Sequence, residues 1–218
     1  MKNAIILLAL LVMSIKTYSQ EWETLNIDSA VSVKLPKGFT ISKKDEKYSL
    51  VAVSPWGTIL IFKILDNPVA TPDIEKDKHL KQYYDDYIKK VRTVSNGAII
   101  KDEKDTLLGE LKVKDFTLQI DTGSGVLYRN FRILHANSST YIFEFLYQDL
   151  HSQYALPEKE KFFSFIEVNE KLDKTDQYTS DAINDNNPTN KKYLFWAIPA
   201  GLIFLVLVYL LLRRKRSS

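Results

Sequence analysis

The sequence contains no cysteine and only seven glycines and seven prolines among its 218 residues. Without thiols the chain has no disulfide framework, no thiolate metal centre, no iron–sulfur cluster and no cysteine nucleophile. The low glycine and proline content excludes collagen-like and linker-dominated chains, and there is no glycine-rich phosphate-binding loop. With 45% hydrophobic and 26% charged residues, the composition is that of a globular protein.

Charge of both signs is present, but it is unevenly distributed. The formal net charge is +3, from 30 Lys and Arg against 27 Asp and Glu. Six of the basic residues lie within residues 1–19 and 213–218, where there is no acidic residue. The remaining 24 bases and 27 acids give residues 20–192 a net charge of −3. This mildly acidic body lacks the basic surface of a nucleic-acid-binding protein, so we expect no nucleic acid as a partner.

The N-terminus has the features of a secretory signal peptide. A basic start is followed by an apolar run over residues 4–13, which is too short to cross a hydrocarbon core of ~30 Å as a helix. Thr17 and Ser19 place small residues at positions −3 and −1 of a cleavage site between Ser19 and Gln20. Residues 1–19 are therefore predicted to be a signal peptide, and their retention as a second anchor stays open.

A second apolar segment, residues 193–212, contains 20 residues without a charge. At ~1.5 Å per residue, a helix of this length matches a bilayer core of ~30 Å. The tail at 213–218 carries four bases, against two at positions 191 and 192, which predicts a cytoplasmic C-terminus. We therefore predict a single-pass protein of the cytoplasmic (inner) membrane, held in the bilayer by residues 193–212, with its N-terminal domain in the periplasm.

The sequence between the two ends divides into a domain and a linker. Residues 169–192 are almost wholly polar, so they are predicted to be a linker without a core of its own. Residues 20–168 are left for one extracytoplasmic domain, whose length is sufficient to fold without disulfides.

Alternation of apolar and polar residues predicts an antiparallel sheet in this domain. Val31, Val33 and Leu35 alternate with polar residues, and residues 54–57 have the composition of a hairpin turn. Short turn-rich connections after residue 120 indicate a meander. The predicted strands cover residues 31–35, 48–53, 58–65, 111–120, 126–136, 141–147 and 165–168.

Two helices are predicted to pack on the sheet. The first begins with Thr71 as its N-cap and Pro72 at its first position, and it stops at residues 96–97. The second occupies part of residues 151–163. The apolar stripe of the first helix consists of Leu80, Tyr84, Tyr87, Ile88 and Val91. This order of elements predicts an α+β fold, an antiparallel β-sheet with packed helices.

Two short stretches resemble a known family. Residues 31–39 (VSVKLPKGF) resemble the opening strand and turn of PsbP/DcrB-type domains. Residues 141–145 (YIFEF) and 163–168 (FSFIEV) are similar to that family's closing segments. The resemblance covers residues 28–168 and implies a Mog/PsbP-like α/β/α sandwich, in an accessory protein of the bacterial envelope rather than an enzyme. The chain lacks the lipid-bearing cysteine of the bacterial lipoprotein members, and no family site residue is carried over.

Two acidic motifs resemble functional sites but lack required parts. Residues 121–124 (DTGS) are similar to the active-site loop of aspartic proteases, which also needs a second such motif and a later supporting glycine. Neither is present in the domain, so we interpret Asp121 as a turn residue. Asp73, Glu75 and Asp77 have the spacing of calcium ligands, but Lys78 occupies the position where an EF-hand loop requires glycine.

The remaining polar motifs indicate no chemistry either. The three histidines, His79, His135 and His151, share no motif and are interpreted as surface or partly buried residues. Residues 187–190 (NPTN) are one residue short of a sortase signal and are assigned to the linker. We therefore predict no catalytic residue, no metal and no cofactor.

Aromatic residues supply the one candidate contact. Residues 141–147 place aromatic side chains on one strand face, which we predict to be core facing the helix stripe. Trp56, in a Pro-Trp-Gly turn, is the better candidate, because a large aromatic at an exposed turn is costly unless it is used. A membrane-tethered binding or accessory module for an envelope protein is thus the favoured function. The alternative is an envelope hydrolase whose Asp and Glu residues the sequence does not pair.

Overall fold

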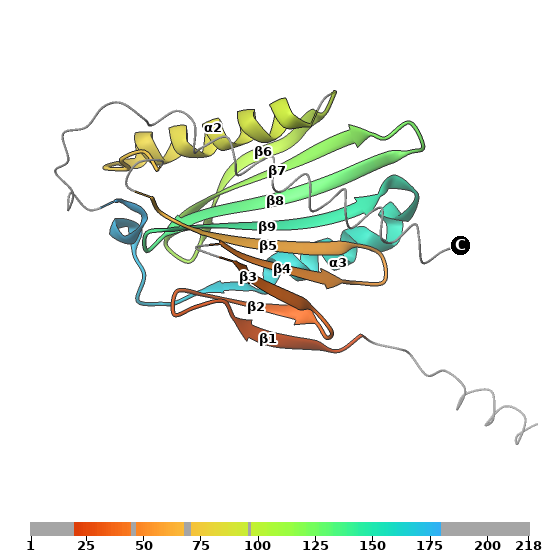
Figure 1. The fold of residues 1–218 in the computed structure, drawn as a ribbon, viewed down its shortest axis with the longest axis horizontal. Helices are drawn as coiled ribbons and strands as arrows, with labels where there is room; N and C mark the ends of the chain where they lie inside the picture. Colours follow the sequence, from red (N-terminus) through yellow and green to blue (C-terminus); the bar gives the residue numbers. More distant parts are fainter. Residues whose placement is uncertain (1–19, 45–46, 68–70, 96, 180–218) are drawn as a thin grey trace, which may run out of the picture.

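The computed structural model describes residues 20–44, 47–67, 71–95 and 97–179 (Figure 1). The predicted signal peptide, the transmembrane segment 193–212, the basic tail and the NPTN motif lie outside these residues. Within the described part, no helix is both long and apolar enough to cross a membrane.

The described residues form two antiparallel sheets (Figure 1). The larger has the strand order β3-β4-β5-β9-β8-β7-β6, and the smaller has the order β1-β2-β10. The small sheet consists of β1 (Trp22–Asn26), β2 (Val31–Pro36) and β10 (Ile166–Val168). The large sheet consists of β3 (Thr40–Lys44), β4 (Lys47–Val53), β5 (Thr58–Leu65), β6 (Ile99–Leu108), β7 (Leu111–Asp121), β8 (Val126–Ala136) and β9 (Ser139–Gln148).

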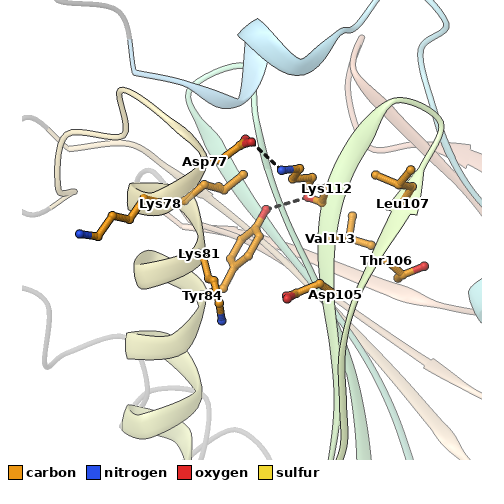
Figure 2. Close-up of a pocket in the computed structure, with 10 residues that line it drawn as sticks. Asp77, Lys78, Lys81, Tyr84, Asp105, Thr106, Leu107, Lys112 and Val113 are labelled. Atoms are coloured by element: carbon orange, nitrogen blue, oxygen red, sulfur yellow. Dashed lines mark hydrogen bonds and ion pairs between the residues drawn. The ribbon is translucent and has the colours of Figure 1, made fainter.

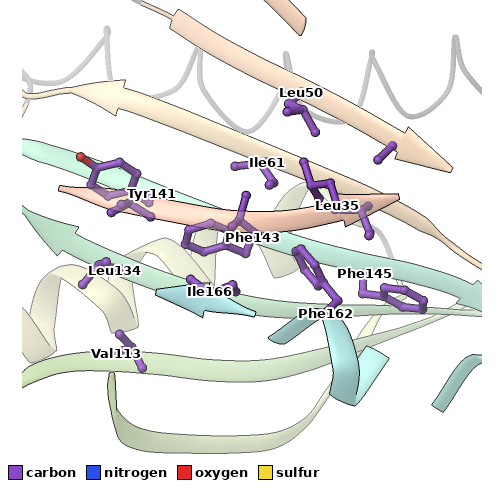
Figure 3. Close-up of a cluster of buried hydrophobic side chains, with 14 of the residues drawn as sticks. Leu35, Leu50, Ile61, Val113, Leu134, Tyr141, Phe143, Phe145, Phe162 and Ile166 are labelled. Atoms are coloured by element: carbon purple, nitrogen blue, oxygen red, sulfur yellow. The ribbon is translucent and has the colours of Figure 1, made fainter. Parts of the chain in front are cut away.

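The large sheet is covered on both faces. The helix α2 (Asp77–Val94) packs on one face through the predicted apolar stripe, whose residues are all buried. The helix α3 (Ser152–Ser164) and the small sheet cover the other face, where Leu35, Phe162 and Ile166 meet the large sheet (Figure 3). The predicted α+β fold with an antiparallel sheet and packed helices is confirmed. The layer opposite α2 contains strands as well as a helix.

The strand β9 is buried on both faces, which corrects one prediction. Tyr141, Phe143 and Phe145 belong to the core beneath the small sheet and α3 (Figure 3). Their neighbour Ile142 faces α2 instead. The aromatic face is therefore core, as predicted, but it faces away from the helix stripe. The sequence did not distinguish the two faces, because Ile142 and Leu146 on one face are as apolar as the aromatic residues on the other.

The sequence analysis missed β1, β3 and β6. The strands β3 and β6 form the two edges of the large sheet, and β6 is mostly exposed. The middle of β6 contains charged residues on both faces and a register shift between Lys101 and Lys104, with Asp102 at φ +52°. An exposed edge strand with a bulge has little apolar alternation, so no period-2 pattern marks it.

The helix α2 begins five residues later than predicted, at Asp77 rather than Pro72, with Lys76 rather than Thr71 as its N-cap. The Thr71 hydroxyl accepts a hydrogen bond from the Asn67 backbone N–H (3.0 Å) instead of capping the helix. Ile74 is fully buried, and its carbonyl accepts from the Thr179 backbone N–H (2.9 Å). These bonds use the Thr71 hydroxyl and the Ile74 carbonyl outside the helix, and the backbone becomes helical only after the extended N-cap residue, Lys76.

The folded body extends beyond the predicted boundary at Val168. Residues 169–179, assigned above to the linker, lie across the body as a strap that contains the 3₁₀ helix η2 (Lys174–Gln177). Gln177 is fully buried, and its amide bonds both backbone groups of Lys112 (2.7 and 2.8 Å) and the His135 carbonyl (2.9 Å). The polar composition of this segment gave no sign of its packing, because hydrogen bonds hold it as well as the contacts of Leu172 and Tyr178 with the core.

Replacing Gln177 should show how strongly the strap is attached. In Gln177→Ala, the Lys112 N–H and the His135 carbonyl lose their Gln177 partner, and the Lys112 carbonyl keeps only the Tyr84 hydroxyl. Each lost partner costs about 1–3 kcal/mol before relaxation. We expect a loss of about 2 kcal/mol in the free energy of unfolding, measured by urea denaturation followed by circular dichroism. Lys171→Ala, an exposed change in the same strap, is the control and should be neutral. Equal stability of the two variants would contradict this account of the strap.

Candidate binding surface

The turn that carries Trp56 is held rigidly. The Ser54 backbone N–H donates to the Gly57 carbonyl (3.0 Å), and the Gly57 N–H donates to the Ser54 hydroxyl oxygen (3.0 Å). From α3, the Glu158 carboxylate accepts from the Ser54 hydroxyl (2.5 Å) and from the Trp56 N–H (3.4 Å). These bonds fix the β4–β5 hairpin against the first half of α3.

An aromatic stack forms where the turn meets α3. The Trp56 and Tyr154 rings lie 4.6 Å apart at an interplanar angle of 24°, and His151 contacts Trp56 at 5.7 Å. Trp56 is 38% exposed, Tyr154 53% and the neighbouring Leu150 86%. We call Trp56, Leu150, His151 and Tyr154 the Trp56 patch. It combines large exposed apolar side chains with a fixed backbone, as binding hot spots do.

The sequence pointed to one member of this patch and missed the others. The predicted exposure of Trp56 agrees with the structure, and its role as a partner contact stays a prediction. Leu150 and Tyr154 lie four positions apart, which places them on one side of a helical turn. That spacing could have indicated that the two side chains share an exposed side. The segment was predicted only as a helix packed on the sheet, and no exposed side was assigned to it.

The sequence also singled out the junction of Ser19 and Gln20. Ser19 lies outside the described residues. The Gln20 amide donates to the Val53 carbonyl (3.1 Å), so the described chain starts beside the end of β4 that leads into the Trp56 turn.

A groove of about 450 Å³ lies between α2 and the β6–β7 hairpin (Figure 2). Asp77 and Lys112 form an ion pair across it (2.7 Å), and the Tyr84 hydroxyl donates to the Lys112 carbonyl (3.1 Å). Hydrogen bonds from Lys112 and Lys174 lower the pKa of Asp77 far below its usual value. Figure 2 shows Lys78 extending away from the groove. The polar groups at this groove thus bind one another, and we assign it a structural role.

The sequence singled out three histidines and three acids, Asp73, Glu75 and Asp77, of which only Asp77 lies in α2. Within the described residues, no three metal-ligating side chains come together. His135 is fully buried, with its ring nitrogens 2.9 Å from the Gln177 carbonyl oxygen and 3.0 Å from an Asp66 carboxylate oxygen. It was predicted to lie at the surface or to be only partly buried, and the structure corrects this: the ring joins the strap to the end of β5. His79 lies beside Glu75 on the solvent side of α2 (3.8 Å).

The hydrolase alternative would need a carboxyl group with a raised pKa within reach of a substrate. Burial raises the pKa of Glu144, against the opposing effect of Arg129. A carboxyl group with a raised pKa is the usual candidate for a general acid. Glu144, however, is fully buried and bonded to Arg129, so no substrate reaches it.

Asp121 lies in a turn, as predicted. Its carboxylate accepts from the Gly123 N–H (2.8 Å), and the Thr122 N–H donates to the Gly125 carbonyl (2.9 Å). The side chain is exposed and closes the β7–β8 hairpin as an Asx turn.

Asp121→Asn should leave the domain almost unchanged. The Asn side-chain oxygen can accept the same bond from Gly123, so we expect a stability change within about 0.5 kcal/mol. Peptide cleavage at acidic and neutral pH should be undetectable for both proteins. Pepstatin-sensitive cleavage that the variant lacks would instead identify Asp121 as catalytic.

No protein-family model matches the sequence, and neither does any curated protein. Solved structures do match. The fold is similar to that of the cyanobacterial PsbP protein (CyanoP) of Synechocystis sp. PCC 6803, with a TM-score of 0.52 and 8% identity, over 71% of this chain and 96% of that one. LpqN of Mycobacterium tuberculosis, which is involved in cell envelope biogenesis, gives a TM-score of 0.41 and 10% identity over 68% and 91% of the two chains.

PA94 of Pseudomonas aeruginosa also matches, with a TM-score of 0.41 and 10% identity over 70% of this chain and 96% of that one. At these identities the likeness concerns the fold, and the CyanoP match carries the assignment. The fold implied by the resemblance of residues 31–39, 141–145 and 163–168 is thereby confirmed: the body of this protein has a PsbP-like fold.

Proposed function

We propose that this protein is a membrane-tethered, extracytoplasmic binding module that contacts an envelope protein through the Trp56 patch. The observation that carries the proposal is the exposed Trp56–Tyr154 stack on a turn fixed by Glu158. Exposed aromatic side chains that are already ordered lose little conformational entropy on binding, so they give a partner a large apolar contact. A PsbP-like fold supports the same function at the level of an accessory domain.

The position of the patch fits a tether at the strap. Figure 1 shows the β4–β5 turn and η2 at opposite ends of the large sheet. The register of β5 against β9 agrees, because Thr58 pairs with Leu146 at the Trp56 end and Leu65 pairs with Ser139 at the strap end. At ~3.3 Å per residue, β5 alone separates the two ends by about 25 Å. A chain that leaves the body after Thr179 toward a membrane helix at 193–212 would therefore leave the patch free for a partner.

Reporter fusions test the tethered topology. Alkaline phosphatase fused after Thr179 should be active, because the signal peptide directs residues 20–192 across the membrane. The same enzyme fused after Ser218 should be inactive, since the basic tail stays in the cytoplasm. The reverse pattern would refute the topology.

Photo-crosslinking in intact cells tests the patch. With p-benzoylphenylalanine in place of Leu150, we expect one protein adduct that disappears when Trp56→Ala is added. Leu107, which is 63% exposed and lies on β6, is the matched control position and should not give that adduct. An adduct formed equally at both positions, or one that persists in Trp56→Ala, would show that the patch is not the contact.

A further inference from the structure

The charged side chains in the two segments that meet at the Trp56 patch are all acidic. Asp149 precedes Leu150 at the start of η1 (Asp149–His151), and Glu158 lies under the turn. No lysine or arginine occurs in residues 148–158 or 50–57, the two segments that meet at the patch. The exposed apolar side chains are therefore bordered by carboxylates.

Cations elsewhere in the domain already cover aromatic rings, but not here. Lys161 lies over Trp22 (4.6 Å), Arg132 over Phe163 (5.3 Å) and Lys34 over Phe165 (5.0 Å). None of the described lysines and arginines lies over Trp56 or Tyr154. The nearest base along the chain, Lys159, is paired with Glu160 (3.0 Å).

We propose that the Trp56 patch binds a basic segment of its partner, in which an arginine or lysine neighbours an apolar residue. This inference rests on the function proposed above and names the partner's chemistry. The cation stacks on the Trp56–Tyr154 pair and forms an ion pair with Asp149, while the apolar neighbour packs on Leu150. A cation within about 6 Å of a ring is attracted by its quadrupole, and most strongly by tryptophan.

The acidic border also favours this segment over other occupants. Opposite charges across an interface steer the encounter and reject partners of the wrong sign. Carboxylates beside the patch repel an acidic segment or an anionic lipid surface. A second copy would bring Asp149 and Glu158 near their own counterparts.

Peptide binding to the full chain tests the proposal. The protein is placed in phosphatidylcholine nanodiscs, which carry no net charge, and titrated with the peptide acetyl-Gly-Leu-Arg-Gly-Leu-Arg-Gly-amide. Two matched peptides replace both arginines, one with citrulline and one with glutamate. We expect the arginine peptide to bind at least ~10-fold more tightly than the citrulline peptide, and the glutamate peptide not to bind.

Variants locate the binding. Tyr154→Ala and Trp56→Ala should each weaken binding of the arginine peptide by ~10-fold. Asp149→Asn should weaken it by a few-fold and reduce its dependence on salt. Asp86→Asn is the control, because Asp86 is an exposed acid on α2, on the other face of the sheet. Circular dichroism checks that Tyr154→Ala, which changes an exposed side chain, leaves the fold intact.

Two results would overturn the inference: equal binding of the arginine and citrulline peptides, or arginine-peptide binding unchanged in both aromatic variants. If the Leu150 crosslink still depends on Trp56 while the arginine peptide does not bind, the proposed function stands and the basic-segment inference fails. If the arginine peptide binds as expected and the crosslink is absent in cells, the proposed function fails instead.

Discussion

Gly57→Val is expected to destabilise the domain by about 3 kcal/mol and to disorganise the Trp56 turn with it. A Cβ atom at this position would lie 2.5 Å from Cζ of Phe145 and 2.9 Å from the Leu146 carbonyl oxygen. Both distances are shorter than non-bonded carbon contacts allow. Phe145 is fully buried and packs toward Phe162, with ring centroids 6.3 Å apart, so its ring has no space to move into. Forcing extra atoms into such a core typically costs 1–3 kcal/mol, and valine adds more than the Cβ.

Gly123→Ala separates this steric effect from backbone strain. Gly123 has φ +73° with open space around it, so alanine there meets no atom but adopts an unfavourable conformation. That strain costs about 1 kcal/mol. Thermal unfolding of the two variants should therefore show the larger loss for Gly57→Val. The smaller substitution Gly57→Ala should cost less stability in a Phe145→Leu background than in the wild-type protein. This would confirm that the Phe145 ring is the obstacle. An equal cost in both backgrounds would contradict the steric account.

Arg129→Met is expected to cost about 3–5 kcal/mol, because it leaves a buried carboxylate without its partner. The Arg129 guanidinium contacts both Glu144 carboxylate oxygens, at 2.8 and 3.0 Å, between the large sheet and α2. The two side chains are 4% and 0% exposed. The Tyr87 hydroxyl, buried in the core beneath α2, has no hydrogen-bond partner. This one neutral donor would replace neither the charge nor the paired contacts of the guanidinium.

The double variant Arg129→Met, Glu144→Leu is the matched control. It removes both charges and fills their space with apolar atoms, which in other buried pairs is neutral or stabilising. We expect it to recover most of the stability lost by Arg129→Met in urea denaturation. If it is as unstable as the single variant, the loss comes from packing rather than from the unpaired charge.

The pH dependence of Arg129→Met provides a second readout. Burial raises the pKa of Glu144 above its usual value of 4.5, and removing Arg129 removes the opposing effect. A raised pKa means that the folded state holds the proton more tightly than the unfolded chain does. The loss of unfolding free energy in the variant, relative to wild type, should therefore be smallest below pH 4.5. It should grow as the pH rises through the folded-state pKa of Glu144. A deficit independent of pH would refute this account.

The sequence predicted α2 and β2 because the burial of each element follows a simple period. Leu80, Tyr84 and Val91 mark one face of α2, and the alternation of Val31, Val33 and Leu35 marks β2. Residues with no such period were misassigned. The strap was taken for a linker, since Gln177 and Thr179 hold it through hydrogen bonds to distant residues. Long-range polar pairing leaves no pattern in one sequence.

The Trp56 patch shows the same limit at the level of function. The Pro-Trp-Gly turn alone indicated an exposed aromatic side chain. The stack with Tyr154 joins residues nearly a hundred positions apart, and only the fold brings the β4–β5 hairpin to α3. The hydrogen bond between Ser54 and Glu158 also joins two residues that are far apart in the sequence. Composition could identify one member of the patch, but the fold was needed to bring the other members to it.

The two edges of the large sheet have a consequence for crowding. Many copies concentrated on one surface meet edge to edge, and an uncharged, straight edge strand would recruit the next copy into a continuous sheet. At one edge, β6 places Lys101, Glu103 and Asp105 along its length and is bent by its bulge. At the other, β3 carries the exposed Lys43. These charges and the bulge act against pairing between the edges of neighbouring copies. Many copies can therefore be crowded on one surface and remain separate molecules.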